Sequence, residues 1–144
     1  MYEVTVGNIG RVHEGDNALE AQEVYEIYLL RSLRNQGRGG QEDVVLWHNG
    51  EPAEEHDASM PRAEDVLKVL PQKEWALERD NKLCLPCGIQ LRWETEEDGR
   101  WCTYHAVAPG VPAVFGSDPE TALKFLQESL RRAAQRLTDL AGAL

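Results

Sequence analysis

One apolar repeat in the last third of the chain restricts the fold more than any other feature of the sequence. From residue 123 onward, an apolar residue recurs with alternating spacings of three and four, at Leu123, Leu126, Leu130, Ala133, Leu137, Leu140 and Leu144. This heptad spacing places all seven side chains on one stripe of an α-helix. A capping box of Ser117 and Glu120, with Pro119 in the first turn, predicts where that helix begins.

The stripe is too long for a small sheet to cover completely. A large exposed apolar patch marks an interaction surface. We therefore predict a homodimer interface on the last part of this helix, formed by Leu130, Leu137, Leu140 and Leu144. In the alternative arrangement, the stripe packs onto short helices that the sequence predicts between residues 63 and 79.

The rest of the chain predicts an α+β fold with two small modules. Residues 1–60 follow a β-β-α-β-β pattern, in which Asn17 and Glu20 form a capping box before the helix and Asn49-Gly50 is a strong hairpin signal. Residues 83–144 contain a β-hairpin, which turns at residues 96–99, and the long helix. We expect Trp93 and Trp101 to be near-neighbours across this hairpin, packed under the helix or, if one is exposed, serving as an interface anchor.

A polar stretch that includes Pro61 separates the two modules. We predict a helical connector over residues 61–82, in which two short helices, 63–70 and 72–79, are broken at Pro71. The three predicted parts are an acidic α+β module (1–60), the connector (61–82) and a hairpin-helix module (83–144).

The negative charge of the chain is concentrated in its first half. The formal net charge is -10, and residues 1–60 contain 12 acidic but only 4 basic residues, a net charge of -8. Such a surface repels phosphates, so direct nucleic-acid binding is not expected, whereas a protein partner with a basic surface is. The residues expected to bind it lie on one predicted helix: Asp16, Glu20, Glu23 and Glu26. The alternative is that these charges serve solubility alone.

Three cysteines and one histidine have a spacing that resembles a zinc site. Cys84 and Cys87 are followed by Cys102 and His105, which gives the four ligands that structural zinc requires. However, the predicted hairpin separates Cys102 from Cys87 by roughly 20 Å along the strands. We therefore expect no metal and no cofactor, and we keep a zinc site at these four residues as the alternative.

The sequence contains no recognisable catalytic constellation. It has neither an H-E-x-x-H nor a G-x-S-x-G motif, and the glycines at 37–40 precede a strand rather than a helix. We predict that the protein is not an enzyme. With no apolar run of 18 residues and no signal-like N-terminus, we expect a cytoplasmic protein.

Residues 88 to about 130 resemble the antitoxin domain of the HicB-like family. The residues that carry the resemblance follow the acidic turn and are Pro109-Gly110, Gly116, Glu120, Ala122 and Leu123. The resemblance implies a degraded ribonuclease-H-like sheet without catalytic acids and a role in neutralising an RNA-cleaving toxin. Many family members carry a DNA-binding segment after this domain, whereas here only the heptad helix follows.

The first half of the chain resembles small uncharacterised proteins of phages and mobile elements. The matching stretches are residues 6–10, 15–17 and 42–46. Together the two resemblances and the charge predict a non-catalytic inhibitor from a phage or mobile element that binds a nucleic-acid-handling protein. An anti-defence role of the anti-CRISPR kind and an antitoxin role both fit. The alternative function is a zinc-stabilised structural module of a larger assembly.

Overall fold

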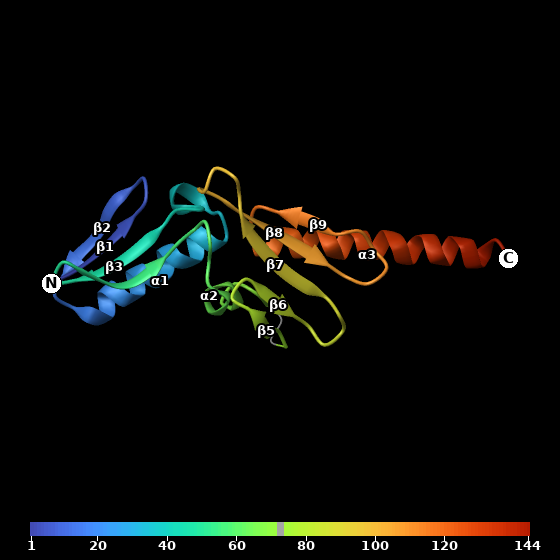
Figure 1. Ribbon diagram of the computed structural model, residues 1–144, viewed down its shortest axis with the longest axis horizontal. Helices are drawn as coiled ribbons and strands as arrows, with labels where there is room; N and C mark the ends of the chain where they lie inside the picture. Colours follow the sequence, from blue (N-terminus) through green and yellow to red (C-terminus); the bar gives the residue numbers. More distant parts are fainter. Residues whose placement is uncertain (72–73) are drawn as a thin grey trace.

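The computed structural model describes residues 1–71 and 74–144, and it confirms the α+β fold class. Two antiparallel sheets of four and five strands lie side by side, and a short helix, α2 (Ala63–Leu67), lies between them (Figure 1). A helix packs on each sheet. The N-terminus and the end of the last helix lie at opposite ends of the long molecule (Figure 1).

The first sheet has the strand order β2-β1-β3-β4 and confirms the predicted β-β-α-β-β pattern. Its strands are β1 (Tyr2–Val6), β2 (Gly10–Gly15), β3 (Val44–His48) and β4 (Glu51–His56). Alternate residues of β1 and β3 point toward α1 (Ala18–Leu33), and the buried set is Val4, Val6, Val44, Leu46, Tyr25 and Leu29. This period of two is why β1 and β3 form strands that the helix covers on one face.

Two local signals that were expected from the sequence, a helix N-cap and a hairpin turn, are present in the first half of the chain. The Asn17 side chain accepts hydrogen bonds from the backbone N–H groups of Leu19 and Glu20, so it caps α1. Asn49 and Gly50 both have positive φ, 52° and 82°, which is the backbone of the tight turn that joins β3 to β4. The short 3-10 helix η1 (Gly37–Gly39) follows α1.

The second sheet is a meander in which each strand pairs with the next. Its strands are β5 (Ala76–Arg79), β6 (Lys82–Cys84), β7 (Gln90–Thr95), β8 (Cys102–Val107) and β9 (Val114–Gly116). The helix predicted over residues 72–79 is wrong for residues 76–79, which form β5, and residues 72 and 73 lie outside the described part of the chain. Pairing with β6 determines this edge strand, and no local signal predicts it.

The two sheets share one core. Trp93 on β7 is 0% exposed, and its indole Nε1–H donates to the carbonyl oxygen of Pro61 at 2.8 Å. One cluster of buried hydrophobic residues extends from Val4 in the first sheet to Leu126 on the last helix. The predicted helical connector is wrong in extent: of its residues that the structure describes, 61–71 and 74–82, the helix covers 63–67, and residues 76–79 and 82 belong to the second sheet.

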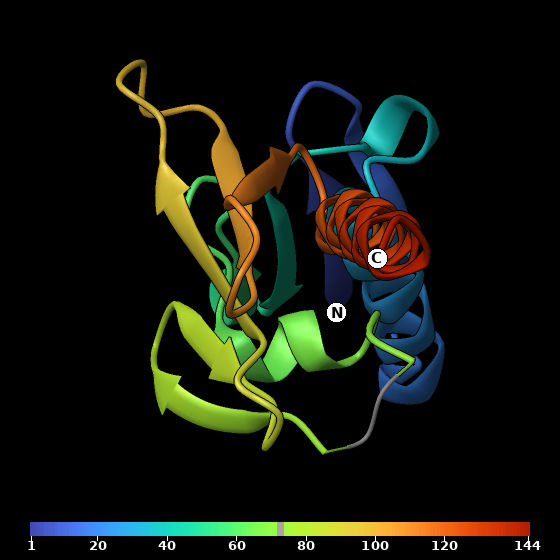
Figure 2. The same ribbon diagram turned by 90° about the vertical axis from the view of Figure 1, so that its right-hand side faces the viewer.

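The last helix, α3 (Pro119–Gly142), projects beyond the rest of the molecule (Figures 1 and 2). Its N-cap is Asp118 rather than the predicted Ser117, since the Asp118 carboxylate accepts from the backbone N–H and the hydroxyl of Thr121. Within α3, Ala122 and Leu126 are buried, whereas every residue from 134 onward is exposed. Among the described helices, none has the length and apolar character needed to cross a lipid bilayer.

Candidate functional site

Two of the four predicted partner-binding carboxylates, Glu20 and Glu23, lie on the open side of α1, whereas Asp16 precedes the N-cap Asn17 and so lies just outside the helix on which it was predicted. Glu20 and Glu23 are exposed and form no ion pair with any residue that the structure describes. The Asp16 side chain is 92% exposed, and its Oδ1 lies 3.4 Å from the N-terminal ammonium, a contact that contributes little at such exposure. Leu19 and Ile27 are also exposed, so this face combines negative charge with apolar area.

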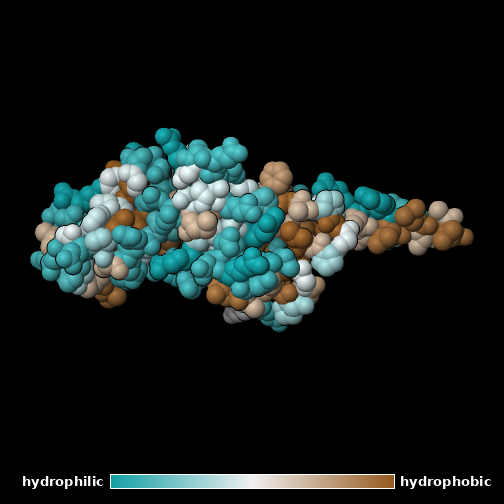
Figure 3. All heavy atoms as spheres, viewed as in Figure 1, coloured by the Kyte–Doolittle hydropathy of each residue, from teal (hydrophilic) through white to brown (hydrophobic). Residues whose placement is uncertain are grey.

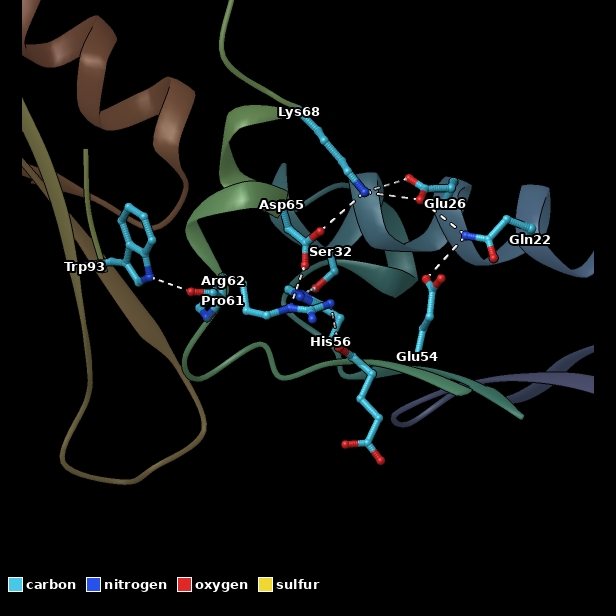
Figure 4. Close-up of polar contacts among 11 residues, drawn as sticks. Gln22, Glu26, Ser32, Glu54, His56, Pro61, Arg62, Asp65, Lys68 and Trp93 are labelled. Carbon is cyan, nitrogen blue, oxygen red and sulfur yellow. Dashed lines mark hydrogen bonds and ion pairs between the residues drawn. The ribbon is translucent and has the colours of Figure 1, made fainter. Parts of the chain in front are cut away.

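Glu26, the fourth predicted residue, is paired inside the molecule (Figure 4). The Lys68 ammonium, which follows α2, lies 3.2 Å from Glu26 Oε1 and 3.3 Å from Asp65 Oδ1. Desolvation lowers the pKa of Lys68, but the hydrogen bond and charge of Glu26 and the charge of Asp65 outweigh it, so the pKa is raised. Glu26 therefore links α1 to α2, and because its side chain is still 37% exposed, its role in partner binding stays a prediction.

A buried serine–histidine pair joins the end of α1 to the end of β4 (Figure 4). Ser32 Oγ lies 3.0 Å from His56 Nε2 and 2.7 Å from the carbonyl oxygen of Glu42. The Ser32 hydroxyl has one proton, and a carbonyl can only accept, so that proton goes to Glu42. His56 Nε2 must then carry a proton and donate it to Ser32 Oγ.

This hydrogen-bond direction has a chemical consequence. An imidazole that donates to the serine cannot accept its proton, so Ser32 and His56 do not form a nucleophile with its general base. Burial lowers the pKa of His56, which keeps the ring neutral. The pair is a structural link between α1 and β4, and the 24-residue separation gave no motif from which to predict it.

A second acidic site lies between the two sheets, just past the end of α1. Here a cleft of ≈ 440 Å³ is lined by three carboxylates, Glu42, Asp43 and Asp57, and by Trp101 at the tip of the β7–β8 hairpin. The Trp101 side chain is 45% exposed. Arg100 is the basic residue of this lining.

Backbone hydrogen bonds hold all three of these carboxylates in place, and Glu42 Oε2 accepts from the backbone N–H of Asn8 at 3.3 Å. Asp43 Oδ1 accepts from the backbone N–H of Ala58 at 2.8 Å, and Asp57 Oδ1 accepts from that of Ser59 at 2.9 Å. Each contact uses one oxygen of its carboxylate. The sequence did not predict this cleft because its lining comes from separate segments, around residues 8, 41–43, 57–59 and 99–101. The one available signal was a tryptophan just after the acidic hairpin turn.

The two tryptophans of the hairpin have different environments. The expected turn at residues 96–99 is present, but Trp93 pairs with Tyr104, three residues beyond Trp101, so the two tryptophans do not lie opposite each other across the hairpin. Trp93 is buried, whereas Trp101 lies beyond the end of the paired strands and is exposed. Trp101 therefore satisfies the condition stated for an interface anchor.

The structure does not bring the four alternative zinc ligands together. Cys84 pairs with Gln90 at one end of β7, and Cys102 pairs with Thr95 at the other. Along β8, Cys102 faces the core while His105, three residues on, points to the opposite face. Burial also raises the pKa of the Cys102 thiol to about 12, which disfavours the thiolate that zinc binds. Within residues 1–71 and 74–144, no group of three or more potential ligands is placed to hold a metal ion.

An apolar groove lies along α3 beside the second sheet. It has a volume of ≈ 410 Å³, and its apolar lining includes Trp75, Leu85, Ile89, Leu123, Leu126 and Leu130. The predicted dimer residues continue from it, with Leu137 67% and Leu140 59% exposed. The alternative, in which the whole stripe packs onto residues 63–79, is wrong for this part of α3. Figure 3 shows hydrophobic side chains along the projecting helix.

Comparisons of the chain with protein-family models, with curated proteins and with solved structures found no match. The resemblances to the HicB-like family and to phage proteins therefore stay predictions.

Proposed function

We propose that the protein is a non-catalytic, acidic inhibitor from a phage or mobile element that acts in the cytoplasm. It binds a nucleic-acid-handling protein and covers the basic surface that this partner uses for nucleic acid. The cleft that places Trp101 beside Glu42, Asp43 and Asp57 is the observation that carries the proposal. An anti-defence protein and an antitoxin both fit this description.

The cleft suits a lysine or arginine side chain of the partner. Three carboxylates attract a cation, and the indole of Trp101 offers an aromatic face on which a guanidinium or ammonium can lie. Exposed tryptophans are also frequent anchors of protein interfaces. Nucleic-acid phosphates would be repelled from the same cleft, so a basic protein surface is the complementary ligand.

The acidic face of α1 supports the same partner class. Within the described part of the chain, Asp16, Glu20 and Glu23 form no ion pair apart from the contact of Asp16 with the N-terminus, so their negative charge faces solvent. Charges of this kind raise the rate of encounter with an oppositely charged surface, and salt weakens the effect. The exposed Leu19 and Ile27 supply apolar contact area on the same helix.

Two further observations are consistent with a binding protein. The proton of Ser32 is committed to a carbonyl, so the one buried serine–histidine pair described above is not arranged for catalysis. The HicB-like marks Gly116 and Ala122 lie in contact: a Cβ at Gly116 would be 3.0 Å from the backbone nitrogen of Ala122. This close approach gives the resemblance a packing reason.

The test begins with capture of a partner from the native host on immobilised protein. The captured protein is then purified, and its nucleic-acid binding is titrated with wild-type chain and with three variants. These are Trp101→Ala, the double reversal Glu20→Lys/Glu23→Lys, and a matched double reversal on the outer side of α3, Glu128→Lys/Asp139→Lys.

We expect stoichiometric wild-type protein to displace the nucleic acid. Trp101→Ala should dissociate faster from the partner, and the α1 reversal should associate more slowly at low salt, while the α3 control stays near wild type. A partner whose nucleic-acid binding is unchanged by an excess of the protein contradicts the proposal. Equal association rates for both double reversals would show that the α1 face serves solubility alone.

A further inference from the structure

We propose that the projecting part of α3 binds the same part of a second copy, with the two helices running in opposite directions. The contact surface is the distal seam, which consists of Leu130, Ala133, Leu137, Leu140 and Leu144. This proposal stands independently of the function proposed above, because different residues carry it.

Leu130 and Ala133 at the start of the distal seam are half-buried, whereas the seam beyond them and the helical turns that carry it are exposed. Leu137 and Leu140 are 67% and 59% exposed, and no element of the described chain packs on α3 beyond residue 133. A helical segment of fewer than about 12–15 residues is marginal in water without packing. A partner that covers the seam would stabilise this helical segment and would bury the exposed apolar patch.

The residues that flank the seam favour another helix as the occupant. The positions on either side of the distal leucines are Ser129, Ala134, Arg136, Ala141 and Ala143. Four of these five side chains are small and uncharged, so a second helix can approach closely without burying charge. The other charged residues of this part, Arg131, Arg132 and Asp139, lie away from the seam.

Opposite helix directions suit the sizes of the seam residues. When Leu130 lies opposite Leu140 of the second copy, Ala133 lies opposite Leu137 of that copy, so a small side chain meets a large one. In a parallel pair, Ala133 would face Ala133 and leave a gap between two leucine layers. The same antiparallel register brings the end of the second helix to the apolar groove, whose last lining residue is Leu130.

The charge distribution points to the same arrangement. Residues 129–144 contain three arginines and one aspartate, although the whole chain carries a net charge of -10. A parallel pair would place two strongly acidic bodies side by side and two basic helix ends together. The antiparallel pair separates the bodies and moves each basic helix end toward the acidic body of the other copy.

The first experiment measures the oligomeric state by sedimentation equilibrium. We expect a concentration-dependent dimer for the wild type and a monomer for Leu137→Glu, because the variant buries a carboxylate in the seam. Leu19→Glu is the matched control, since Leu19 is 68% exposed on α1 and Leu137 is 67% exposed on α3. Circular dichroism confirms that both variants fold, and Leu140→Glu provides a second disruption of the seam.

The second experiment determines helix direction by disulfide cross-linking in a Cys84→Ser/Cys87→Ser background. Ala134→Cys should cross-link to itself, because in the antiparallel register the two residues 134 lie on the same side of the seam and only two residues out of step, whereas a parallel pair places them on opposite sides. Ala133→Cys alone should not cross-link efficiently. Efficient cross-linking of Ala133→Cys to itself would overturn the direction. A wild type that is monomeric at all concentrations, or a dimer that Leu137→Glu leaves intact, would overturn the proposal as a whole.

Discussion

The helices α1 and α3 begin in the same way but are supported differently along their length. Each follows a strand and has an N-cap whose side chain accepts from backbone N–H groups, Asn17 for α1 and Asp118 for α3. The first sheet covers α1 from Ala21 to Leu33, and Ser32 holds its far end. The second sheet covers only the first part of α3, up to about Leu130. An N-cap and apolar spacing thus start a helix, whereas tertiary contact determines whether each turn is stabilised.

The sharpest test of this comparison uses one substitution at two places on α3. Leu126 is 2% exposed and Leu137 is 67% exposed. We expect Leu126→Ala to lower the free energy of unfolding by roughly 2–5 kcal/mol, since it opens a cavity in the shared core. At concentrations where the chain is monomeric, Leu137→Ala should change it by less than about 0.5 kcal/mol. Urea unfolding measures both, and equal losses would mean that α3 is supported along its whole length.

A second pair of variants compares Gly116, the last residue of β9 before α3, with Gly142, the last residue of α3. A Cβ at Gly116 would lie 3.0 Å from the Ala122 backbone nitrogen, whereas one at Gly142 would meet nothing within 4 Å. We expect Gly116→Ala to destabilise by about 1–3 kcal/mol through crowding. Gly142→Ala should stabilise the helix end by about 0.4–1 kcal/mol. Thermal unfolding checks the two signs, and a loss of stability at both positions would contradict the open surroundings of Gly142.

Removal of either N-cap should lower the free energy of unfolding by a smaller amount. Asn17→Ala should cost about 1 kcal/mol, which is typical of an exposed cap. Asp118 is 8% exposed and accepts from both the backbone and the hydroxyl of Thr121, so Asp118→Ala should cost more, up to about 2 kcal/mol. Denaturant unfolding of each variant tests this order, and a larger cost at Asn17 would reverse it.

His56, which holds the far end of α1 through Ser32, predicts that stability depends on pH. His56 has a pKa lowered from 6.5 by burial, so as pH falls through 6.5 the unfolded chain gains a proton that the folded chain does not. Stability is therefore lost between pH 6.5 and the lowered folded pKa, by up to about 1.4 kcal/mol per pH unit. His56→Gln retains a donor toward Ser32 and should show a shallower dependence in urea unfolding between about pH 7.5 and 5. Identical slopes would show that His56 is not responsible.

Local signals in the sequence were sufficient for most elements. Asn17 predicted the start of α1, and Asn49-Gly50 predicted the turn between β3 and β4, because each acts through its own backbone. β5 could not be predicted in this way, since it is a strand only through pairing with β6. The N-cap of α3 was predicted at Ser117 but is Asp118, because serine and aspartate both cap helices well and the two residues are adjacent in the sequence.

The candidate site was predicted only in part, for a related reason. Glu20 and Glu23 lie on one face of α1 because helix geometry is local, whereas Asp16 lies just before the N-cap. Glu26 has the same spacing, but Lys68, 42 residues later in the chain, neutralises it. The cleft around Trp101 depends on how two sheets meet, and spacing within one segment carries no information about that contact.

The shared core also orders the events of folding during synthesis. The first sheet is complete once His56 has left the ribosome, and all four of its strands and α1 lie within residues 2–56. Trp93, which donates to Pro61, and Leu126, which completes the buried cluster, emerge much later. We therefore expect the nascent chain to pass through a stage in which the first sheet is formed and the apolar side of α2, including Val66, is not yet covered. At that stage we expect the acidic residues of the first half to repel neighbouring nascent chains on the same messenger and so to oppose aggregation.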